Sequence, residues 1–254
     1  MGQWDLVIVS IKESDMVLEV IDARVARETR SLKLEELVEK MGKKLIIVIN
    51  KTDLVSADFE KKIRAELKKE HEIVSVSTKD RKGTGFLKGA IKKYNPKLVC
   101  VVGYPNCGKS SIINMLAHTS GAKTSSVPGY TKHAQWIRLS KETKLLDTPG
   151  VVPSDEKFSV FTGSVRPEKL KVAEVAAAQL LVKIKDDAEG TNIEEFYKVP
   201  LDDVDEFLSA LALKRNYLLK GGFDVERAAR QVIRDWNTGK LTAWWYDAGR
   251  DKDV

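Results

Sequence analysis

Short apolar runs alternate with amphipathic segments along roughly the first 165 residues of the chain. The apolar runs are rich in β-branched side chains and predict strands at residues 16–21, 44–50, 73–77, 97–102, 135–139 and 144–148. Between them, apolar residues three and four positions apart predict helices at residues 32–41, 58–70, 86–94 and 108–118. Residues 4–14 are ambiguous, because their β-branched content favours a strand whereas their polar spacing allows a helix. The alternation predicts an α/β domain with a mostly parallel sheet and helices on both faces.

The strand pattern stops after about residue 165. Three longer segments follow at residues 167–184, 202–218 and 224–240, of which the first opens with Pro167 at a favourable first-turn position. The segments carry acidic residues near their start and basic residues near their end, as the helix dipole favours. We therefore expect an α/β domain over residues 1–165 and an all-helical C-terminal domain over residues 166–254. A chain of 254 residues is long enough for both.

Composition describes an ordinary globular protein, with 43% hydrophobic and 31% charged residues. No apolar run approaches 18 residues, so the sequence predicts neither a membrane span nor a membrane partner. The two cysteines, Cys100 in a strand and Cys107 in a glycine-rich loop, are too few for a zinc site and are consistent with a reducing cytoplasm.

Basic residues concentrate in one stretch of the chain. The net charge is +6, but residues 79–144 alone carry 13 basic and two acidic side chains. Such a stretch suits a polyanion. The alternative interpretation is a solvated helix face together with the few charges that a nucleotide site needs.

The stretch Gly103–Ser111, GYPNCGKSS, fits the phosphate-binding pattern G-x-x-x-x-G-K-[ST] and follows a predicted strand. In this pattern backbone N–H groups converge on the β-phosphate, while Lys109 reaches β- and γ-oxygens and Ser110 places a hydroxyl on Mg²⁺. The alternative is a plain glycine turn before a buried helix. The remaining phosphate-binding positions predicted here are Pro105, Asn106, Cys107, Gly108 and Ser111.

Two further segments would complete the phosphate and metal site. LLDTPG ends a predicted strand with Asp147, whose carboxylate can hold Mg²⁺ through water, and then supplies the Gly150 amide for the γ-phosphate. An aspartate at such a turn can also be a turn former only. SVPGYTK contains Thr131, the hydroxyl that we expect in the metal shell, although a plain surface loop is the alternative. Ser110, Thr131 and Asp147 are therefore the predicted metal ligands, and Lys109, Asn106, Thr131 and Gly150 the predicted catalytic residues.

The base is expected to lie on INKTDL. Guanine presents adjacent N1–H and N2–H₂ donors that one carboxylate can accept together, so Asp53 would select guanine. Asn50 would steady the loop, and the aliphatic stem of Lys51 would lie on the purine. Ser77, Thr78 and Lys79 end the next strand, where the Thr78 amide could meet the guanine carbonyl. The sequence thus favours GTP and GDP over adenine nucleotides.

These motifs all lie just after predicted strands, where open α/β sheets bind their ligands. Their order is unusual, because the base-binding segments precede the phosphate loop. A circularly permuted sheet explains the order, since the same strands can be present while the chain enters elsewhere.

The sequence resembles the circularly permuted GTPases of the YlqF-like ribosome-assembly group. The resemblance rests on SDMVLEVIDAR, INKTDL, GYPNCGKSS, PGYTKH, DTPG and RDWNTGKL, in this order. It implies a circularly permuted P-loop GTPase domain and GTP hydrolysis coupled to maturation of the large ribosomal subunit. It also implies ribosomal RNA as a partner of the helical domain and of the basic surfaces.

Two positions bear on the mechanism that the resemblance implies. Val151 stands where many GTPases keep a water-orienting glutamine, so we expect slow turnover, on the order of 10⁻⁴ to 10⁻³ s⁻¹, until a partner completes the site. Asn106 matches the asparagine that potassium-using relatives employ to hold K⁺, with loop stabilisation as the alternative. The family's N-terminal histidine has no counterpart before His71, and we expect His133 to be structural or RNA-facing, with a catalytic role as the alternative.

Two other functions remain open at this point. The same phosphate loop could serve phosphoryl transfer to a small molecule, and the chain could be a regulatory GTP switch with a non-ribosomal protein partner. The sequence favours a monomer that does not bind DNA.

Overall fold

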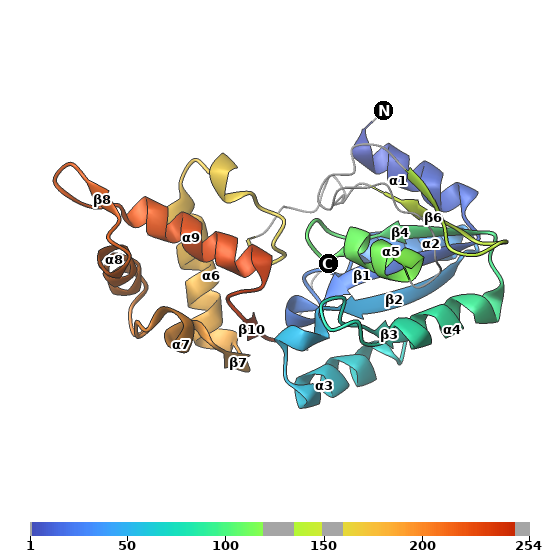
Figure 1. Cartoon of the computed structure of the whole chain (residues 1–254), viewed down its shortest axis with the longest axis horizontal. Helices are drawn as coiled ribbons and strands as arrows, with labels where there is room; N and C mark the ends of the chain where they lie inside the picture. Colours follow the sequence, from blue (N-terminus) through green and yellow to red (C-terminus); the bar gives the residue numbers. More distant parts are fainter. Residues whose placement is uncertain (1, 119–134, 149–159, 247–254) are drawn as a thin grey trace. The chain divides into compact units, whose positions relative to one another are not determined.

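The computed structural model describes residues 2–118, 135–148 and 160–246 (Figure 1). The chain forms two compact units, Met1–Lys157 and Phe158–Val254. The sequence placed the boundary eight residues later, after residue 165.

The first unit is built on a six-stranded sheet in the order β3-β2-β1-β4-β6-β5. Its strands are β1 (Met16–Asp22), β2 (Lys44–Asn50), β3 (Glu72–Ser75), β4 (Leu98–Val102), β5 (Gln135–Arg138) and β6 (Lys144–Asp147). All neighbouring pairs are parallel except β5 with β6, which is antiparallel at the edge. Every residue of β1 is buried, as its continuous apolar run predicts for a central parallel strand.

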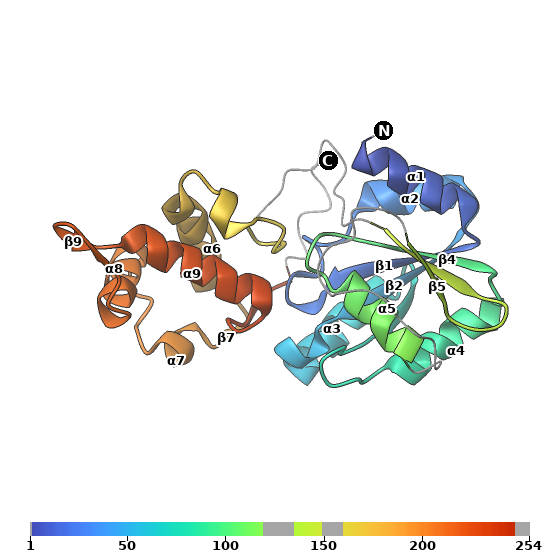
Figure 2. The same ribbon diagram turned by 45° about the horizontal axis from the view of Figure 1, so that its top comes forward.

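Helices cover both faces of this sheet (Figure 2). On one face, α1 (Gln3–Glu13) and α2 (Leu32–Lys40) contribute Ile11 and Val38 to a core with Val17 and Cys100 of the strands. On the other face, α4 (Thr84–Tyr94) and α5 (Lys109–His118) contribute Leu87 and Leu116 to a second core. Two short 3₁₀ turns, η1 (Ala23–Val25) and η2 (Thr52–Leu54), follow β1 and β2, and α3 (Ala57–Leu67) connects η2 to β3. The predicted α/β architecture is confirmed.

The ambiguous N-terminal segment is the helix α1. Its Val7 and Ile11 lie four positions apart and are both buried, so helical spacing brings its apolar side chains onto one face. The Gly2 amide donates to the Asp5 carboxylate (N···Oδ2 2.7 Å), which caps the first turn.

The second unit is mainly helical. After η3 (Pro167–Lys169) it contains α6 (Ala173–Asp187), α7 (Ile193–Tyr197), α8 (Val204–Lys214) and α9 (Val225–Thr238). The prediction of an all-helical domain needs one correction, because two short antiparallel ladders are also present. They pair β7 (Gly190–Thr191) with β10 (Ala243–Trp244) and β8 (Leu218–Leu219) with β9 (Gly222–Phe223). Two-residue strands are too short to show a period-2 pattern.

The core of this unit explains where it begins. The buried rings of Trp236 and Trp245 stack at 5.7 Å between centroids. The Trp236 indole donates to the Phe161 carbonyl (3.1 Å), and the Asn237 amide donates to the Val165 carbonyl (2.8 Å). Residues 160–165 therefore belong to the second unit, and no local sequence signal marks these long-range bonds. None of the described helices is long and apolar enough to span a bilayer.

One buried acid lies in the middle of the central strand. Glu19 is fully buried on β1 and accepts a hydrogen bond from the Ser31 amide at 2.8 Å. Burial, and next the charge of Glu35, raise its pKa well above the usual glutamate value. Glu35 itself is paired with Arg30 and His71. The folded protein therefore holds a proton at Glu19 that the unfolded chain releases near its ordinary pKa.

Replacement of Glu19 by glutamine should change how stability depends on pH. Because the folded pKa is raised, the contribution of Glu19 is fully present below the unfolded pKa and is lost as pH rises toward the folded value, by about 1.4 kcal/mol per pH unit. Glu19→Gln keeps the oxygen that accepts from Ser31 and has no proton to lose. Urea denaturation at pH 5 and pH 8 should show the variant gaining stability over the wild type at the higher pH. Glu36→Gln, at an exposed position of α2, is the control, and parallel pH dependences of wild type and Glu19→Gln would contradict the assignment.

Candidate nucleotide-binding site

Residues 103–108 form the loop that joins β4 to α5, and close contacts with neighbouring strands require glycine at two of its positions. Gly103 has φ +134°, and a Cβ there would lie 2.3 Å from the carbonyl oxygen of Val20. Gly108 has φ +96°, and a Cβ there would lie 2.2 Å from Nδ2 of Asn50. Both glycines of the predicted pattern are therefore required by the backbone path and by neighbours from β1 and β2.

Lys109 is the first residue of α5 and folds back over the loop. Its buried Nζ donates to the carbonyls of Gly103 and Tyr104, each at 2.8 Å. Burial lowers the pKa of Lys109 to about 8. The ammonium is thus held at the mouth of the loop, where oxygens of a phosphate would relieve its desolvation.

Ser110 and Asp147 come together from different parts of the chain. Ser110 lies in the first turn of α5 and Asp147 ends β6, and their Oγ and Oδ2 atoms are 3.4 Å apart. A hydroxyl and a carboxylate oxygen are ligands that suit Mg²⁺, which commonly takes one or two protein groups in addition to phosphate oxygens and water. The described residues contain no cluster of three metal-binding side chains, and this two-residue set fits a magnesium ion shared with a nucleotide.

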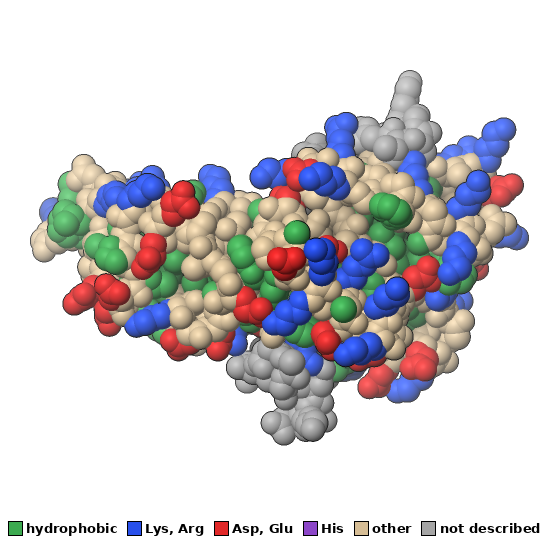
Figure 3. Space-filling view, turned by 90° about the horizontal axis from the view of Figure 1, so that it is seen from below, with side chains coloured by type: hydrophobic (Ala, Val, Ile, Leu, Met, Phe, Trp, Pro, Cys, Tyr) green, Lys and Arg blue, Asp and Glu red, His purple; other side chains and the backbone are tan. Residues whose placement is uncertain are grey.

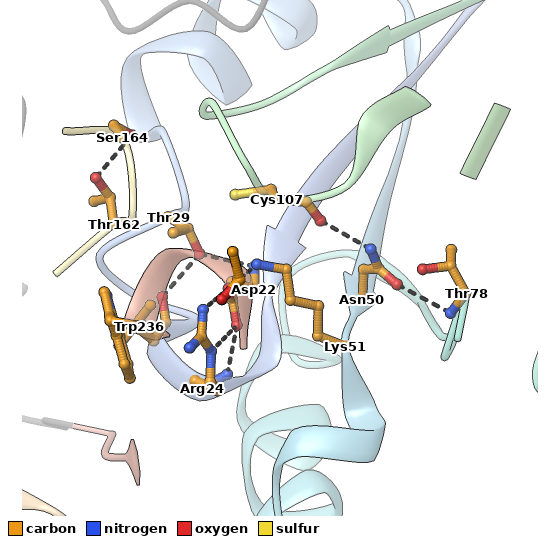
Figure 4. Close-up of polar contacts among 12 residues, drawn as sticks. Asp22, Arg24, Thr29, Asn50, Lys51, Thr78, Cys107, Thr162, Ser164 and Trp236 are labelled. Carbon is orange, nitrogen blue, oxygen red and sulfur yellow. Dashed lines mark hydrogen bonds and ion pairs between the residues drawn. The ribbon is translucent and has the colours of Figure 1, made fainter. Parts of the chain in front are cut away.

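Asn50 connects the base segment to the phosphate loop (Figure 4). The residue is buried at the end of β2, where its Nδ2 donates to the Cys107 carbonyl at 2.8 Å. Its Oδ1 accepts from the Thr78 amide at 3.4 Å. The contact of the Thr78 amide with the guanine carbonyl stays a prediction.

Asp53 lies in η2 with one carboxylate oxygen held by a neighbour. The Ser77 hydroxyl donates to its Oδ1 at 2.7 Å, and Lys79 places its ammonium 3.9 Å from Oδ2. Ser77 Oγ also accepts from the Asp80 amide at 3.0 Å, so the serine is fixed in turn. The structure therefore brings Asp53, Ser77 and Lys79 together, and their contacts with a base stay predictions.

Lys51 has partners that the sequence did not indicate. It adopts a left-handed conformation (φ 63°), and its Nζ donates to Asp22 Oδ2 at 2.7 Å. Asp22 ends β1 and is also paired with Arg24. The sequence does contain a signal for Asp22. Like Asn50, it is the polar residue that ends an apolar strand, which places it at the same edge of the sheet.

Cys107 lies buried inside the phosphate loop. Burial, and next the charge of Asp22, raise the pKa of its thiol to about 12. Burial also raises the pKa of Cys100 in β4. Burial therefore favours the protonated form of both thiols.

The other predicted site residues fall into two groups. Pro105 is half-buried in the phosphate loop, while Asn106 (φ 63°) and Ser111 are exposed. Thr131, His133, Gly150 and Val151 lie outside the described residues, so their roles stay predictions.

Comparison with known proteins places this site in a family. The profile described as RsgA GTPase matches residues 6–155, and the profile described as 50S ribosome-binding GTPase matches residues 98–215. An uncharacterized GTP-binding protein of Methanocaldococcus jannaschii, MJ1464, is 41% identical over 96% of this chain and 68% of its own length. The chain belongs to the circularly permuted GTPases.

Solved and named relatives of this permuted GTPase agree with that assignment. The structure of YlqF from T. maritima, bound to GNP, matches with a TM-score of 0.64 and 26% identity, over 91% of this chain and 92% of that one. Nucleolar GTP-binding protein 2 of Yarrowia lipolytica is 33% identical over 99% of the chain. The chain spans about half the length (52%) of that relative. The permuted GTPase is a GTP hydrolase, as the motifs predicted.

Proposed function

We propose that this permuted GTPase acts in assembly of the large ribosomal subunit, hydrolysing GTP slowly alone and faster when ribosomal RNA or subunits complete its site. The observation that supports this proposal most directly is that phosphate-, metal- and base-binding side chains meet at one edge of the sheet in a chain of this family. These side chains are Lys109, Ser110, Asp147, Asn50 and Asp53. The 50S ribosome-binding profile and the nucleolar relatives support the ribosomal partner.

The proposed mechanism assigns each described residue to a part of the nucleotide. Lys109 would bind the β- and γ-phosphates, and Ser110 and Asp147 would hold Mg²⁺, which neutralises charge on these phosphates. Asp53 would accept the two guanine donors while Asn50 holds both loops together. Thr131 and Gly150 would complete the γ-phosphate contacts, and Asn106 would hold K⁺. With Val151 after DTPG, no glutamine at that position orients water, so a partner would supply this function.

The experiment for this proposal is GTP turnover in potassium buffer with and without purified large ribosomal subunits. A value near 10⁻⁴ to 10⁻³ s⁻¹ is expected for the protein alone, with at least about a tenfold rise on addition of subunits. Substitution of sodium for potassium tests the role of Asn106, with Asn106→Ala as the variant that should lose the difference. Tight GTP binding without stimulation would contradict the ribosomal role and favour a switch that acts on another protein.

RNA binding is proposed to involve the exposed face of α4 and the loop before it. Residues 79–97 carry seven basic side chains and one acidic one, and Lys79, Arg81, Lys82 and Lys92 are exposed. Phe86 is 81% exposed on α4. It follows Gly85 and precedes Gly89 by three residues, and added Cβ atoms at both glycines would meet nothing within 4 Å. Figure 3 shows basic side chains spread over the side of the first unit that carries α3 and α4, with acidic ones between them. An exposed ring on an open basic surface suits base stacking beside phosphate contacts.

Binding to ribosomal RNA should weaken when this surface is changed. Combined Lys82→Ala and Lys92→Ala should reduce the slope of log K against log salt by about 2, because each lost phosphate contact removes about 1. Phe86→Ala should weaken binding by about 1–3 kcal/mol with an unchanged slope. Lys61→Ala on α3 combined with Lys68→Ala at the C-cap of that helix is the matched control, and equal losses in both pairs would argue against a specific surface.

The cellular location and oligomeric state stay predictions. A cytoplasmic monomer is proposed from the sequence, whereas several relatives carry the word nucleolar in their names.

A further inference from the structure

A buried carboxylate at the end of β1 contacts the base-binding segment. Asp22 accepts from Arg24 Nε and the Arg24 amide through Oδ1, each at 3.1 Å, and from Arg24 Nη2 through Oδ2 at 2.8 Å. The same Oδ2 accepts from Lys51 Nζ at 2.7 Å, and the Asp22 amide donates to Thr29 Oγ1 at 3.0 Å. The Arg24 amide and two cations therefore hold the Asp22 carboxylate, while the Thr29 hydroxyl holds the Asp22 backbone (Figure 4).

The strand register explains how Lys51 reaches this carboxylate. Asp22 lies directly opposite Asn50 in the parallel pair β1–β2, so Lys51 is the first residue beyond the ladder. Its left-handed conformation ends the strand, and its side chain turns back toward the end of β1. The aliphatic stem thus crosses from β2 to β1 along the edge of the sheet on which Asp53 and the phosphate loop also lie.

Charge balance makes Asp22 necessary to this arrangement. The carboxylate is buried, which by itself would raise its pKa, but Arg24 and then Lys51 outweigh burial and hold the pKa far below the usual aspartate value. Asn50, which lies opposite Asp22 in the ladder, donates to the Cys107 carbonyl at 2.8 Å, so the cluster lies close to the phosphate loop. Without the carboxylate, two neighbouring cations would repel each other in a poorly solvated place.

We propose that Asp22 is a positioning residue for the guanine subsite, which holds Lys51 Nζ at the end of β1 so that the Lys51 stem forms one wall of the purine site. The inference rests on the proposed function, because it takes the segment Asn50–Asp53 as the base subsite. Lysine has one of the largest rotamer entropies, so a stem that is already fixed binds a flat ring at lower entropic cost. In this proposal the Lys51 stem contacts the base of the nucleotide and does not contact its phosphates.

The test compares a ligand that has a base with one that lacks it. GDP and inorganic pyrophosphate are titrated into the full chain carrying Asp22→Asn, Lys51→Met, or both. Each single variant is expected to weaken GDP about tenfold and pyrophosphate less than about twofold, and the double variant should lose no more than either single. Asp15→Asn is the matched control, because Asp15 precedes the other end of the same strand and binds the Lys97 and Leu98 amides.

The outcomes separate this inference from a general loosening of the sheet and from the proposed function. Equal losses for GDP and pyrophosphate, or a double variant whose loss is the product of the singles, would overturn it. If Asp22→Asn does not fold, Lys51→Met carries the test, and an unchanged ratio of GDP to pyrophosphate affinity in that variant overturns the inference. A wild-type protein that binds GDP no better than ADP would overturn the proposed function as well.

Discussion

Asp53→Asn is expected to lower GDP affinity by roughly 10² to 10³-fold and to reverse base preference toward xanthine. The carboxylate would accept both guanine donors, and each charge-assisted bond contributes about 1.5–3 kcal/mol. The asparagine side chain keeps one acceptor oxygen, but its NH₂ group would face the NH₂ group at guanine C2, so two donors would oppose each other. Xanthine has a carbonyl at that position, which can accept from the asparagine NH₂ group. Because Ser77 Oγ donates to Asp53 Oδ1, asparagine can keep this bond and the loop should stay in place.

Equilibrium binding of GDP, XDP and ADP by wild type and variant measures this effect. Asp58→Asn is the matched control, because Asp58 lies exposed in the first turn of α3, five residues further along the chain. We expect the control to bind GDP like the wild type. Unchanged GDP affinity in Asp53→Asn would refute the assigned role of this carboxylate.

Gly108→Ala is expected to reduce affinity for GTP and GDP by more than about 100-fold, equivalent to about 2.7 kcal/mol. Two costs combine in this substitution. A φ of +96° is strained for alanine, and the new Cβ would lie 2.2 Å from Asn50 Nδ2. Asn50 would have to move, which removes its bond to the Cys107 carbonyl and shifts the base segment relative to the phosphate loop.

Nucleotide binding and thermal unfolding of the same samples separate a site defect from misfolding. Gly89→Ala on α4 is the control, since its added Cβ meets nothing within 4 Å and should stabilise the helix by up to about 1 kcal/mol. Pyrophosphate should lose affinity together with GDP in Gly108→Ala, in contrast to the variants of Asp22 and Lys51. A Gly108→Ala protein that binds GDP normally would contradict the close packing of the two loops.

Asn50 makes the nucleotide site a single unit despite the altered chain order. Its residue number is 57 lower than that of Cys107, yet its amide connects the Cys107 carbonyl to the Thr78 amide. In a parallel sheet the carboxyl ends of β1, β2, β4 and β6 meet at one edge irrespective of the order in which the chain visits them. Circular permutation therefore preserves the site, because it changes the connections and not the positions of the strands.

Local patterns in the sequence are sufficient to predict the architecture of the first unit and the edge of the sheet at which its site lies. A strand that is buried on both faces is apolar throughout, so continuous apolar runs predict the central strands. A motif directly after such a run lies at the carboxyl edge of the sheet, where ligands bind. The positions of Asn50, Asp147 and the phosphate loop directly after such runs therefore predict that they lie at one edge of the sheet. The order of the motifs indicated the permuted family, which the comparisons confirm.

Tertiary structure alone decided which groups pair across the sheet and where the units divide. The bond of Lys51 to Asp22, and that of Trp236 to Phe161, join residues 29 and 75 positions apart, for which sequence periodicity carries no information. The helical form of α1 likewise depended on the core that receives Val7 and Ile11. Periodicity reports which faces of a segment are apolar, whereas packing determines what each face meets.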